Sequence, residues 1–205
     1  MGSNIKEIHK QIIVGKAVKL FISEGINNVT MSDIAKDIGI GEATLYRYFG
    51  RKQNIVLLGA VALWETLCAE YLENSLGMTG CERMESFYYA FLKAYQEKRE
   101  YYSFIYEFDS LLVQEKMDKD LLIEYDKLLK RLGNMWIEIY EQGVADKTLY
   151  YVEDPKVFYI TSTHSLLNLC KKLAKESTSL NSDGEIDPEK EIELLIKMIL
   201  NYIKR

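Results

Sequence analysis

Residues 30–49 read TMSDIAKDIGIGEATLYRYF, and this stretch predicts two short helices that cross tightly. Thr30 suits the N-cap of the first helix, because its hydroxyl can accept the free N–H of Asp33 while the Asp33 carboxylate reaches back, as in a capping box. Gly39 fits the left-handed position that ends a helix sharply. The apolar positions of the small core beneath the turn would be Ile34, Ala35, Ile38, Ile40 and Leu45. We therefore expect a helix-turn-helix.

The second helix of this unit is the candidate DNA-reading surface. In a helix-turn-helix this helix lies in the major groove with its N-terminal residues on base edges, which points to residues 42–48. Arg47 is the best base reader, because a guanidinium can pair bidentately with guanine. Glu42 would either accept a hydrogen bond from a cytosine amino group or point to solvent, and we favour solvent. Similar units also occur without DNA contact, but exposed Tyr46, Arg47 and Tyr48 on one short helix are hard to explain as packing.

A wider set of residues resembles the TetR/AcrR family of one-component regulators. The match covers about the first sixty residues and joins the helix-turn-helix core to a Thr-Leu-Tyr-x-x-Phe-x-x-Lys tail in register. Beyond that region the chain resembles the family only in length and helical character. The residues that carry the resemblance are Ala17 to Phe21, Gly25, Thr30, Ile34, Ala35, Gly39, Thr44 to Phe49 and Lys52.

The resemblance implies specific roles in DNA binding. Thr30 and Lys52 would hold phosphates, Tyr46 would pack on the DNA backbone, and the remaining side chains would reach bases or nearby phosphates. Gly41 departs from the family pattern, because a Ser or another side-chain cap is common there. The expected DNA-contacting set is Thr30, Ser32, Ala43, Thr44, Tyr46, Arg47, Tyr48 and Lys52.

Charge and composition restrict the function classes. The net charge is −5, yet residues 1–52 hold eight basic against five acidic residues, so a polyanion would bind at this end. Three cysteines at no metal-like spacing read as reduced core residues, and no cluster suggests a metal, cofactor or catalytic site. We therefore do not expect an enzyme. Neither a signal peptide nor a membrane span is apparent, so we expect a cytoplasmic protein.

The whole chain reads as all-α. A helix from about residue 5 to 24 completes a three-helix DNA-binding domain at 1–52, and a larger helical ligand-binding and dimerisation domain follows at 53–205. Apolar periodicity in the second domain predicts helices near 52–74, 82–97, 104–112, 121–139, 155–176 and 188–204.

Fifteen tyrosines, thirteen of them beyond residue 52, could line an aromatic pocket for a small effector. The alternative is that nucleotide bias and ordinary core packing explain them. His164 shares a stripe with Val157, Ile160 and Leu167, which favours a core histidine over a ligand contact. The candidate ligand-binding residues are Trp64, Phe91, Phe104, Phe108, Trp136, His164 and Asn168.

The last two helices carry apolar residues on more than one side, which predicts that they form a four-helix dimer interface with a second subunit. The alternative is an intramolecular core alone. The expected protein is a homodimeric repressor on a palindromic double-stranded DNA operator, released when an apolar or aromatic effector moves helix 52–74. A ligand-independent regulator and one controlled by a protein partner remain as alternatives.

Overall fold

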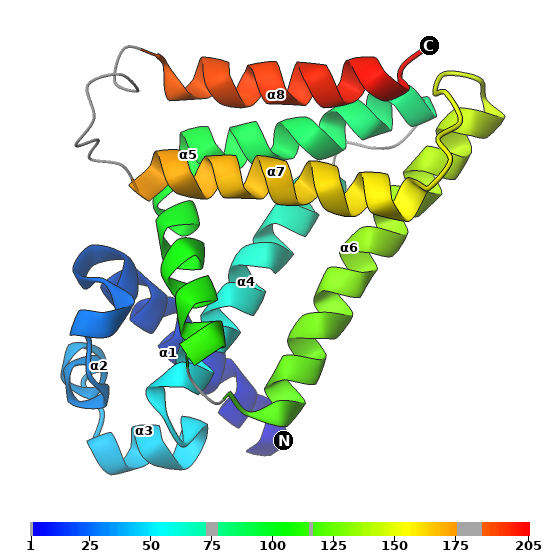
Figure 1. Cartoon of the computed structure of the whole chain (residues 1–205). Helices are drawn as coiled ribbons and strands as arrows, with labels where there is room; N and C mark the ends of the chain where they lie inside the picture. The colour runs from blue at the N-terminus through cyan, green and yellow to red at the C-terminus, as the bar shows by residue number, and fades with distance from the viewer. Residues whose placement is uncertain (1, 73–77, 115–116, 176–185) are drawn as a thin grey trace. The chain divides into compact units, whose positions relative to one another are not determined.

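A computed structural model describes residues 2–72, 78–114, 117–175 and 186–205, and it confirms the all-α fold (Figure 1). Within these ranges no strand is present, although Leu149 and Lys204 form one isolated bridge. None of the described helices is long and apolar enough to cross a membrane. The elements are α1 (Gly2–Glu24), the 3₁₀ turn η1 (Ile26–Asn28), α2 (Met31–Ile38), α3 (Glu42–Phe49), α4 (Lys52–Leu72), α5 (Gly80–Gln114), α6 (Lys119–Ala145), α7 (Pro155–Lys175) and α8 (Pro188–Ile203).

The ends of α2 are set by local chemistry, as the sequence predicts. The Thr30 hydroxyl accepts a hydrogen bond from the Asp33 N–H at 3.2 Å, and the Asp33 carboxylate accepts one from the Thr30 N–H at 2.9 Å. These two bonds satisfy donors that the first turn of a helix leaves unpaired. Gly39 ends α2 in the left-handed conformation, with φ 79° and ψ 33°. A side chain at this position would strain the turn that leads into α3.

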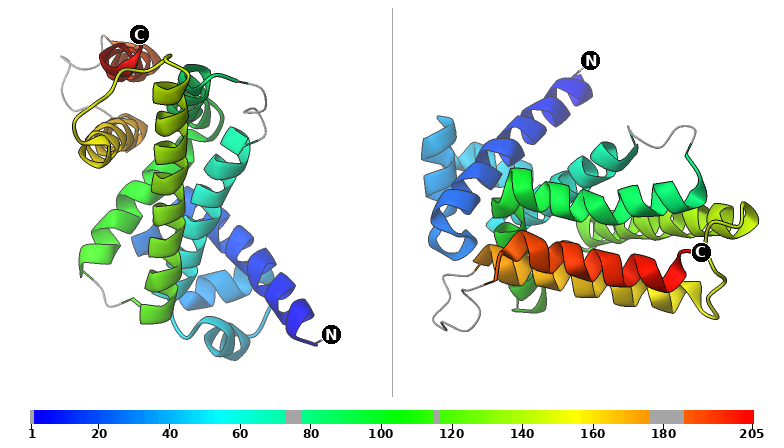
Figure 2. Two further views of the ribbon diagram at one scale, coloured as in Figure 1. Left: turned by 90° about the vertical axis from the view of Figure 1, so that its right-hand side faces the viewer. Right: turned by 90° about the horizontal axis from the view of Figure 1, so that it is seen from above.

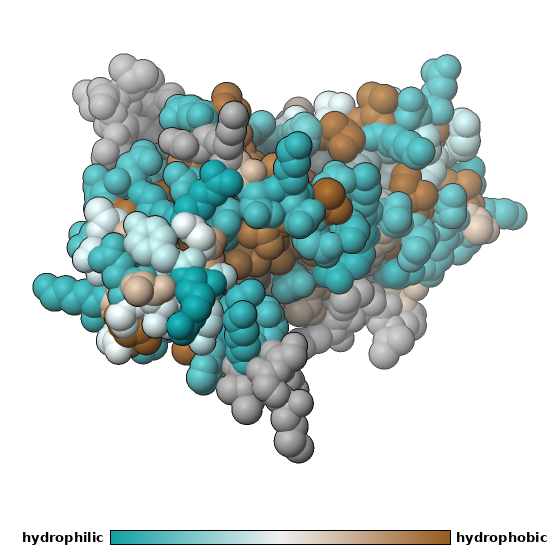
Figure 3. All heavy atoms as spheres, turned by 90° about the horizontal axis from the view of Figure 1, so that it is seen from below, coloured by the Kyte–Doolittle hydropathy of each residue, from teal (hydrophilic) through white to brown (hydrophobic). Residues whose placement is uncertain are grey.

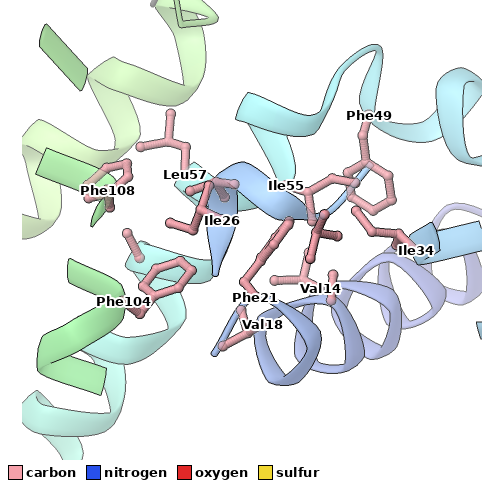
Figure 4. Packing of buried hydrophobic residues seen from close by; sticks show 14 of the residues in the cluster. Val14, Val18, Phe21, Ile26, Ile34, Phe49, Ile55, Leu57, Phe104 and Phe108 are labelled. Atoms are coloured by element: carbon pink, nitrogen blue, oxygen red, sulfur yellow. The ribbon is translucent and has the colours of Figure 1, made fainter. Parts of the chain in front are cut away.

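Residues 1–64 and 103–126 form one compact unit with a continuous apolar core. Figure 4 shows side chains from α1, α2, α3, α4 and α5 converging in this core. The rings of Phe21 and Phe104 lie 6.3 Å apart. A Cβ on Gly59 would lie only 2.6 Å from Val18 Cγ2, so this glycine lets α4 approach α1 closely. The helix-turn-helix is therefore packed on α1 and α4 rather than standing alone.

Residues 65–102 and 127–205 form the second compact unit. Here α7 and α8 lie side by side and antiparallel (Figure 2). Both begin at a proline that follows an aspartate cap: the Asp154 carboxylate accepts from the Val157 N–H at 3.0 Å, and that of Asp187 accepts from the Glu189 N–H at 3.0 Å. The expected functional division at residue 52 stays a prediction.

Helix α5 differs from the expectation of two separate helices at 82–97 and near 104–112. One element covers both stretches, with non-helical backbone angles at Lys98 (φ −145°, ψ 43°). Beyond this break the Tyr102 hydroxyl donates to the Phe91 carbonyl oxygen at 2.9 Å. Arg99 donates to the Leu173 carbonyl oxygen at 2.6 Å, near the C-terminal end of α7. Side-chain bonds thus hold the helix on both sides of an interruption that apolar periodicity does not reveal.

Candidate nucleic-acid interface

Helix α3 exposes most of the residues that the sequence singled out. Glu42, Ala43, Tyr46 and Arg47 are exposed, whereas Thr44 and Tyr48 are half-buried. Leu45 and Phe49 are buried in the core beneath and fix the rotation of the helix about its axis. Glu42 is exposed, which fits both a contact with a cytosine amino group and a position in solvent. The adjacent residues Tyr46 and Arg47 therefore present an aromatic ring and a guanidinium outward.

A cationic and aromatic cluster surrounds Tyr48. The Arg47 guanidinium lies 5.7 Å from the centroid of the Tyr48 ring, and the Lys6 ammonium of α1 lies 5.8 Å from it. Cations over an aromatic face are held by the ring quadrupole, which here gathers two positive charges beside α3. Lys6 is not among the DNA-contacting residues expected from the sequence. In the sequence only the positive charge of Lys6 suggests DNA binding, because a single sequence does not reveal that the start of α1 lies beside the end of α3.

Thr30 and Ser32 are exposed at the start of α2. The Thr30 hydroxyl donates to the Asp33 carboxylate at 2.6 Å and also accepts from the Asp33 N–H. The hydrogen bonds from Thr30 lower the pKa of Asp33. The hydroxyl therefore serves first as a cap, which is compatible with a nearby phosphate but does not require one.

Lys52 is placed differently from a simple phosphate ligand. Its ammonium donates to the carbonyl oxygens of Ile26 and Val29, each at 2.8 Å, and the side chain is half-buried. Two of its three N–H groups are thus directed at the backbone between α1 and α2. The expected contact between Lys52 and a phosphate stays a prediction. The two bonds to carbonyl oxygens give Lys52 a structural role as well.

The face of the molecule that carries α3 is mostly hydrophilic or intermediate in hydropathy (Figure 3). Among the residues that the structure describes, no group of three or more His, Cys, Asp or Glu side chains is arranged to hold a metal ion. The exposed groups of α3 are suited to hydrogen bonding and charge pairing with a polyanion.

This chain is similar in sequence and in fold to known regulators. Residues 13–58 match the bacterial regulatory proteins of the tetR family. An HTH-type transcriptional regulator of Staphylococcus aureus (strain MRSA252) is 27% identical over 156 residues, covering 75% of this chain and 70% of the relative. Another, from strain USA300, is 46% identical over 55 residues, covering 27% of this chain and 29% of that protein. The crystal structure of a TetR-family transcriptional regulator from Agrobacterium tumefaciens superposes with a TM-score of 0.73 at 13% identity, covering 98% of this chain and all of the other.

Over residues 13–58 the chain is therefore similar to the tetR family of bacterial regulatory proteins, and its fold is similar to that of the A. tumefaciens regulator. It is a DNA-binding transcriptional regulator rather than an enzyme. The family match falls on residues 13–58, which include the helix-turn-helix, whereas the similarity to the A. tumefaciens structure extends over 98% of this chain.

The expected ligand-binding residues are divided between the two compact units of the chain. Trp64, Phe104 and Phe108 belong to the first compact unit, where the Trp64 indole donates to the Tyr125 hydroxyl at 3.1 Å. Tyr125 in turn makes an edge contact with Phe108, with ring centroids 5.5 Å apart. Phe104 and Phe108 are both buried. Phe104 and Phe108 therefore contribute to the core that carries the helix-turn-helix, whereas Trp64 is half-buried and bonded to Tyr125, which packs against that core.

Phe91 and Trp136 are buried in the second unit. The Trp136 indole donates to the Tyr88 hydroxyl at 3.1 Å, and that hydroxyl shares a hydrogen bond with Ser162 at 2.7 Å. Trp136 also stacks on Tyr140, with centroids 5.5 Å apart and planes 6° from parallel. Periodicity predicts burial of these residues, but it does not predict this polar chain within the core.

His164 and Asn168 lie on the exposed side of α7, so the expected core position of His164 is wrong. Its stripe partners Val157 and Ile160 are also exposed, at 60% and 46%. The stripe exists as predicted, but it faces away from this subunit's own core. Helical spacing identifies an apolar face and cannot tell which partner covers it.

Proposed function

We propose that this protein is a repressor that binds a pseudo-palindromic operator as a homodimer and is released by a small apolar or aromatic effector. Two copies of α3, related by the two-fold axis of the dimer, would enter successive major grooves. The effector would act by binding more tightly to a conformer whose two recognition helices no longer match the half-site spacing.

The observation that carries the DNA-binding part is the outward presentation of Tyr46 and Arg47 on α3, with Lys6 beside Tyr48. Arg47 would read a base, and Tyr46 would pack on the DNA backbone. Lys52 would contribute by holding the backbone before α2 and would add charge near a phosphate. The other proposed contacts are Thr30, Ser32, Ala43, Thr44 and Tyr48.

The homodimer is supported by an exposed apolar face on α7 and α8. Exposed apolar side chains recur at helical spacing on both helices, and Tyr202 of α8 stacks on the half-buried Phe158 of α7 with centroids 5.4 Å apart, which links the two helices. A surface of this kind is typical of a protein–protein interface. A second copy of this chain supplies the same face, and an isologous contact would cover both. The exposed residues are Val157, Ile160, Leu194, Met198 and Tyr202.

The effector proposal draws on the aromatic interior of the second unit. Trp136 is surrounded by Tyr88, Tyr140 and Tyr159, so an effector that enters there would meet rings and a few hydroxyl groups. Such surroundings favour an apolar or aromatic molecule with one or two polar atoms. The alternatives are a regulator that binds no small molecule and one whose acidic second domain, residues 53–205, binds a partner protein.

The test is a selection of random DNA duplexes by the purified wild-type protein and by the Arg47→Ala variant, with a salt titration of each. A palindrome recovered by the wild type and lost in the variant supports the proposal. Equal, sequence-indifferent binding by both proteins would contradict it. The recovered duplex then serves to screen small molecules for release, and the absence of any such response favours the ligand-independent alternative.

A further inference from the structure

Ile26, in the turn between α1 and α2, has both of its backbone polar groups bound by charged side chains. Its N–H donates to the Glu107 carboxylate of α5 at 2.7 Å, and its carbonyl oxygen accepts from the Lys52 ammonium of α4 at 2.8 Å. The Ile26 side chain is 1% exposed and lies in the same apolar core as Phe108 (Figure 4). Ile26 is therefore held in place by the burial of its side chain and by hydrogen bonds at both its N–H and its carbonyl oxygen.

The conformation of Gly25 makes the contact with Glu107 possible. Gly25 has φ 86°, a value that side chains rarely permit, and a Cβ there would lie 3.6 Å from Glu107 Oε2. Glu107 itself is half-buried. A hydrogen bond from a backbone N–H to a partly desolvated carboxylate is among the stronger kinds, because the acceptor is charged.

This turn determines where the helix-turn-helix begins. Only three residues separate Ile26 from Thr30, the N-cap of α2, and Val29 is held by the same Lys52 ammonium. Glu107 is the contact that ties the turn to α5, a helix that begins among the residues of the second unit and ends in the first. Loss of the carboxylate would release one side of Ile26 while leaving α2 and α3 intact.

We propose that Glu107 is a positioning residue for DNA recognition: by holding the Ile26 N–H it fixes the turn that sets the position of α2 and α3. The inference rests on the proposed reading of DNA by α3. It predicts a change in specific binding, in which α3 must sit in register with the bases. Non-specific binding depends on charge and tolerates a displaced helix.

The sign of the effect separates positioning from simple electrostatics. Removal of any carboxylate near the interface makes the protein less negative, which strengthens its attraction to DNA of every sequence. If Glu107 acts only through its charge, Glu107→Gln raises specific and non-specific affinity together. If it positions the turn, specific affinity falls although a negative charge has been removed.

The experiment compares full-length wild type, Glu107→Gln and the control Glu24→Gln. Glu24 is exposed and adjacent to the turn, so its substitution removes the same charge without touching the Ile26 N–H. Each protein binds the duplex recovered by wild-type selection and a scrambled duplex of equal length. We expect the ratio of specific to non-specific affinity to fall about fivefold in Glu107→Gln, the difference between a charged and a neutral acceptor, and to stay constant in Glu24→Gln.

Hydrogen exchange of the Ile26 amide gives a readout that needs no DNA. We expect exchange to become about fivefold faster in Glu107→Gln and to stay unchanged in Glu24→Gln. Unchanged exchange, or an unchanged affinity ratio in a wild type that prefers one duplex, would overturn the role of Glu107 and leave the proposed function standing. If the wild type prefers no duplex, the proposed function fails and the inference about recognition fails with it, whatever the exchange rates.

Discussion

The Lys52 ammonium donates a hydrogen bond to the carbonyl oxygen of Val29 at 2.8 Å, and a second one of equal length reaches Ile26. The Lys52→Gln substitution replaces the charged ammonium donor by a neutral amide. The side chain is also shorter and does not reach both carbonyl oxygens. We expect the free energy of unfolding without DNA to fall by about 2 kcal/mol, within the usual range for hydrogen bonds to charged groups. Urea denaturation followed by circular dichroism measures it.

The matched control for Lys52 is Lys19→Gln, because Lys19 is exposed on α1. The free energy of unfolding of the Lys19→Gln variant should stay within about 0.5 kcal/mol of that of the wild type. A Lys52→Gln variant as stable as Lys19→Gln would show that the carbonyl bonds contribute little. The salt dependence of DNA binding then tests the predicted phosphate contact, since loss of one such contact lowers the slope of log K against log salt by about 1.

The buried chain from Trp136 through Tyr88 to Ser162 makes a second prediction. Tyr88→Phe keeps the ring but leaves the indole N–H and the serine hydroxyl without this partner, while burial prevents water from replacing it freely. We expect a loss of about 1 to 3 kcal/mol in the free energy of unfolding. Tyr151→Phe removes a hydroxyl from a residue that is 74% exposed and should cost almost nothing. Equal stabilities for the two variants would argue against this network.

How much the sequence reveals depends on the separation of the interacting residues. The cap of α2, the left-handed Gly39 and the Asp187 cap of α8 each depend on residues within four positions, and all are predictable. The bond between Ile26 and Glu107 joins residues 81 positions apart, so only the folded chain reveals it. Lys52 illustrates the middle case, because its motif identified it as important while its carbonyl partners remained hidden.

The same limit explains the second unit. Spacing alone predicted an apolar stripe through His164, and the stripe is present, but the direction in which it faces depends on how α7 packs. Likewise, Phe104 and Phe108 read as aromatic pocket candidates, whereas they lie in the core that supports the helix-turn-helix. A stripe or a ring identifies a packing surface, and its partner is decided by tertiary structure.

Alkaline pH should destabilise the protein through Cys170. Burial raises the pKa of this thiol from 9.0 to about 12, so the folded protein retains a proton that the unfolded chain releases. The stabilisation is fully present below pH 9 and is lost as the pH rises toward 12, by at most about 1.4 kcal/mol per pH unit. Tyr125 and Tyr159, whose pKa values burial raises to about 12, act in the same direction above pH 10.

The contribution of Cys170 is isolated by comparing wild type with Cys170→Ala in urea at pH 7, 8 and 10.5. Between pH 7 and 8 the stability difference should stay constant, because the thiol is protonated in both states. At pH 10.5 the difference should shrink by about 2 kcal/mol, since the alanine variant has no thiol to ionise. A difference that does not change with pH would mean that the thiol ionises as easily in the folded protein as in the unfolded chain.

The exposed face of α8 gives the prediction that most directly tests assembly. Met198 is 61% exposed in the single subunit, between Leu194 and Tyr202 on the same stripe. If a second copy covers this face, Met198→Glu places a carboxylate in an apolar interface, and we expect the dimer to weaken by about 100-fold. Sedimentation at micromolar concentration measures the change. Ile123→Glu on α6, at a residue that is 52% exposed outside this face, should leave the mass unchanged. A wild type that is monomeric, or a Met198→Glu variant that remains as dimeric as the control, would contradict an interface on α8.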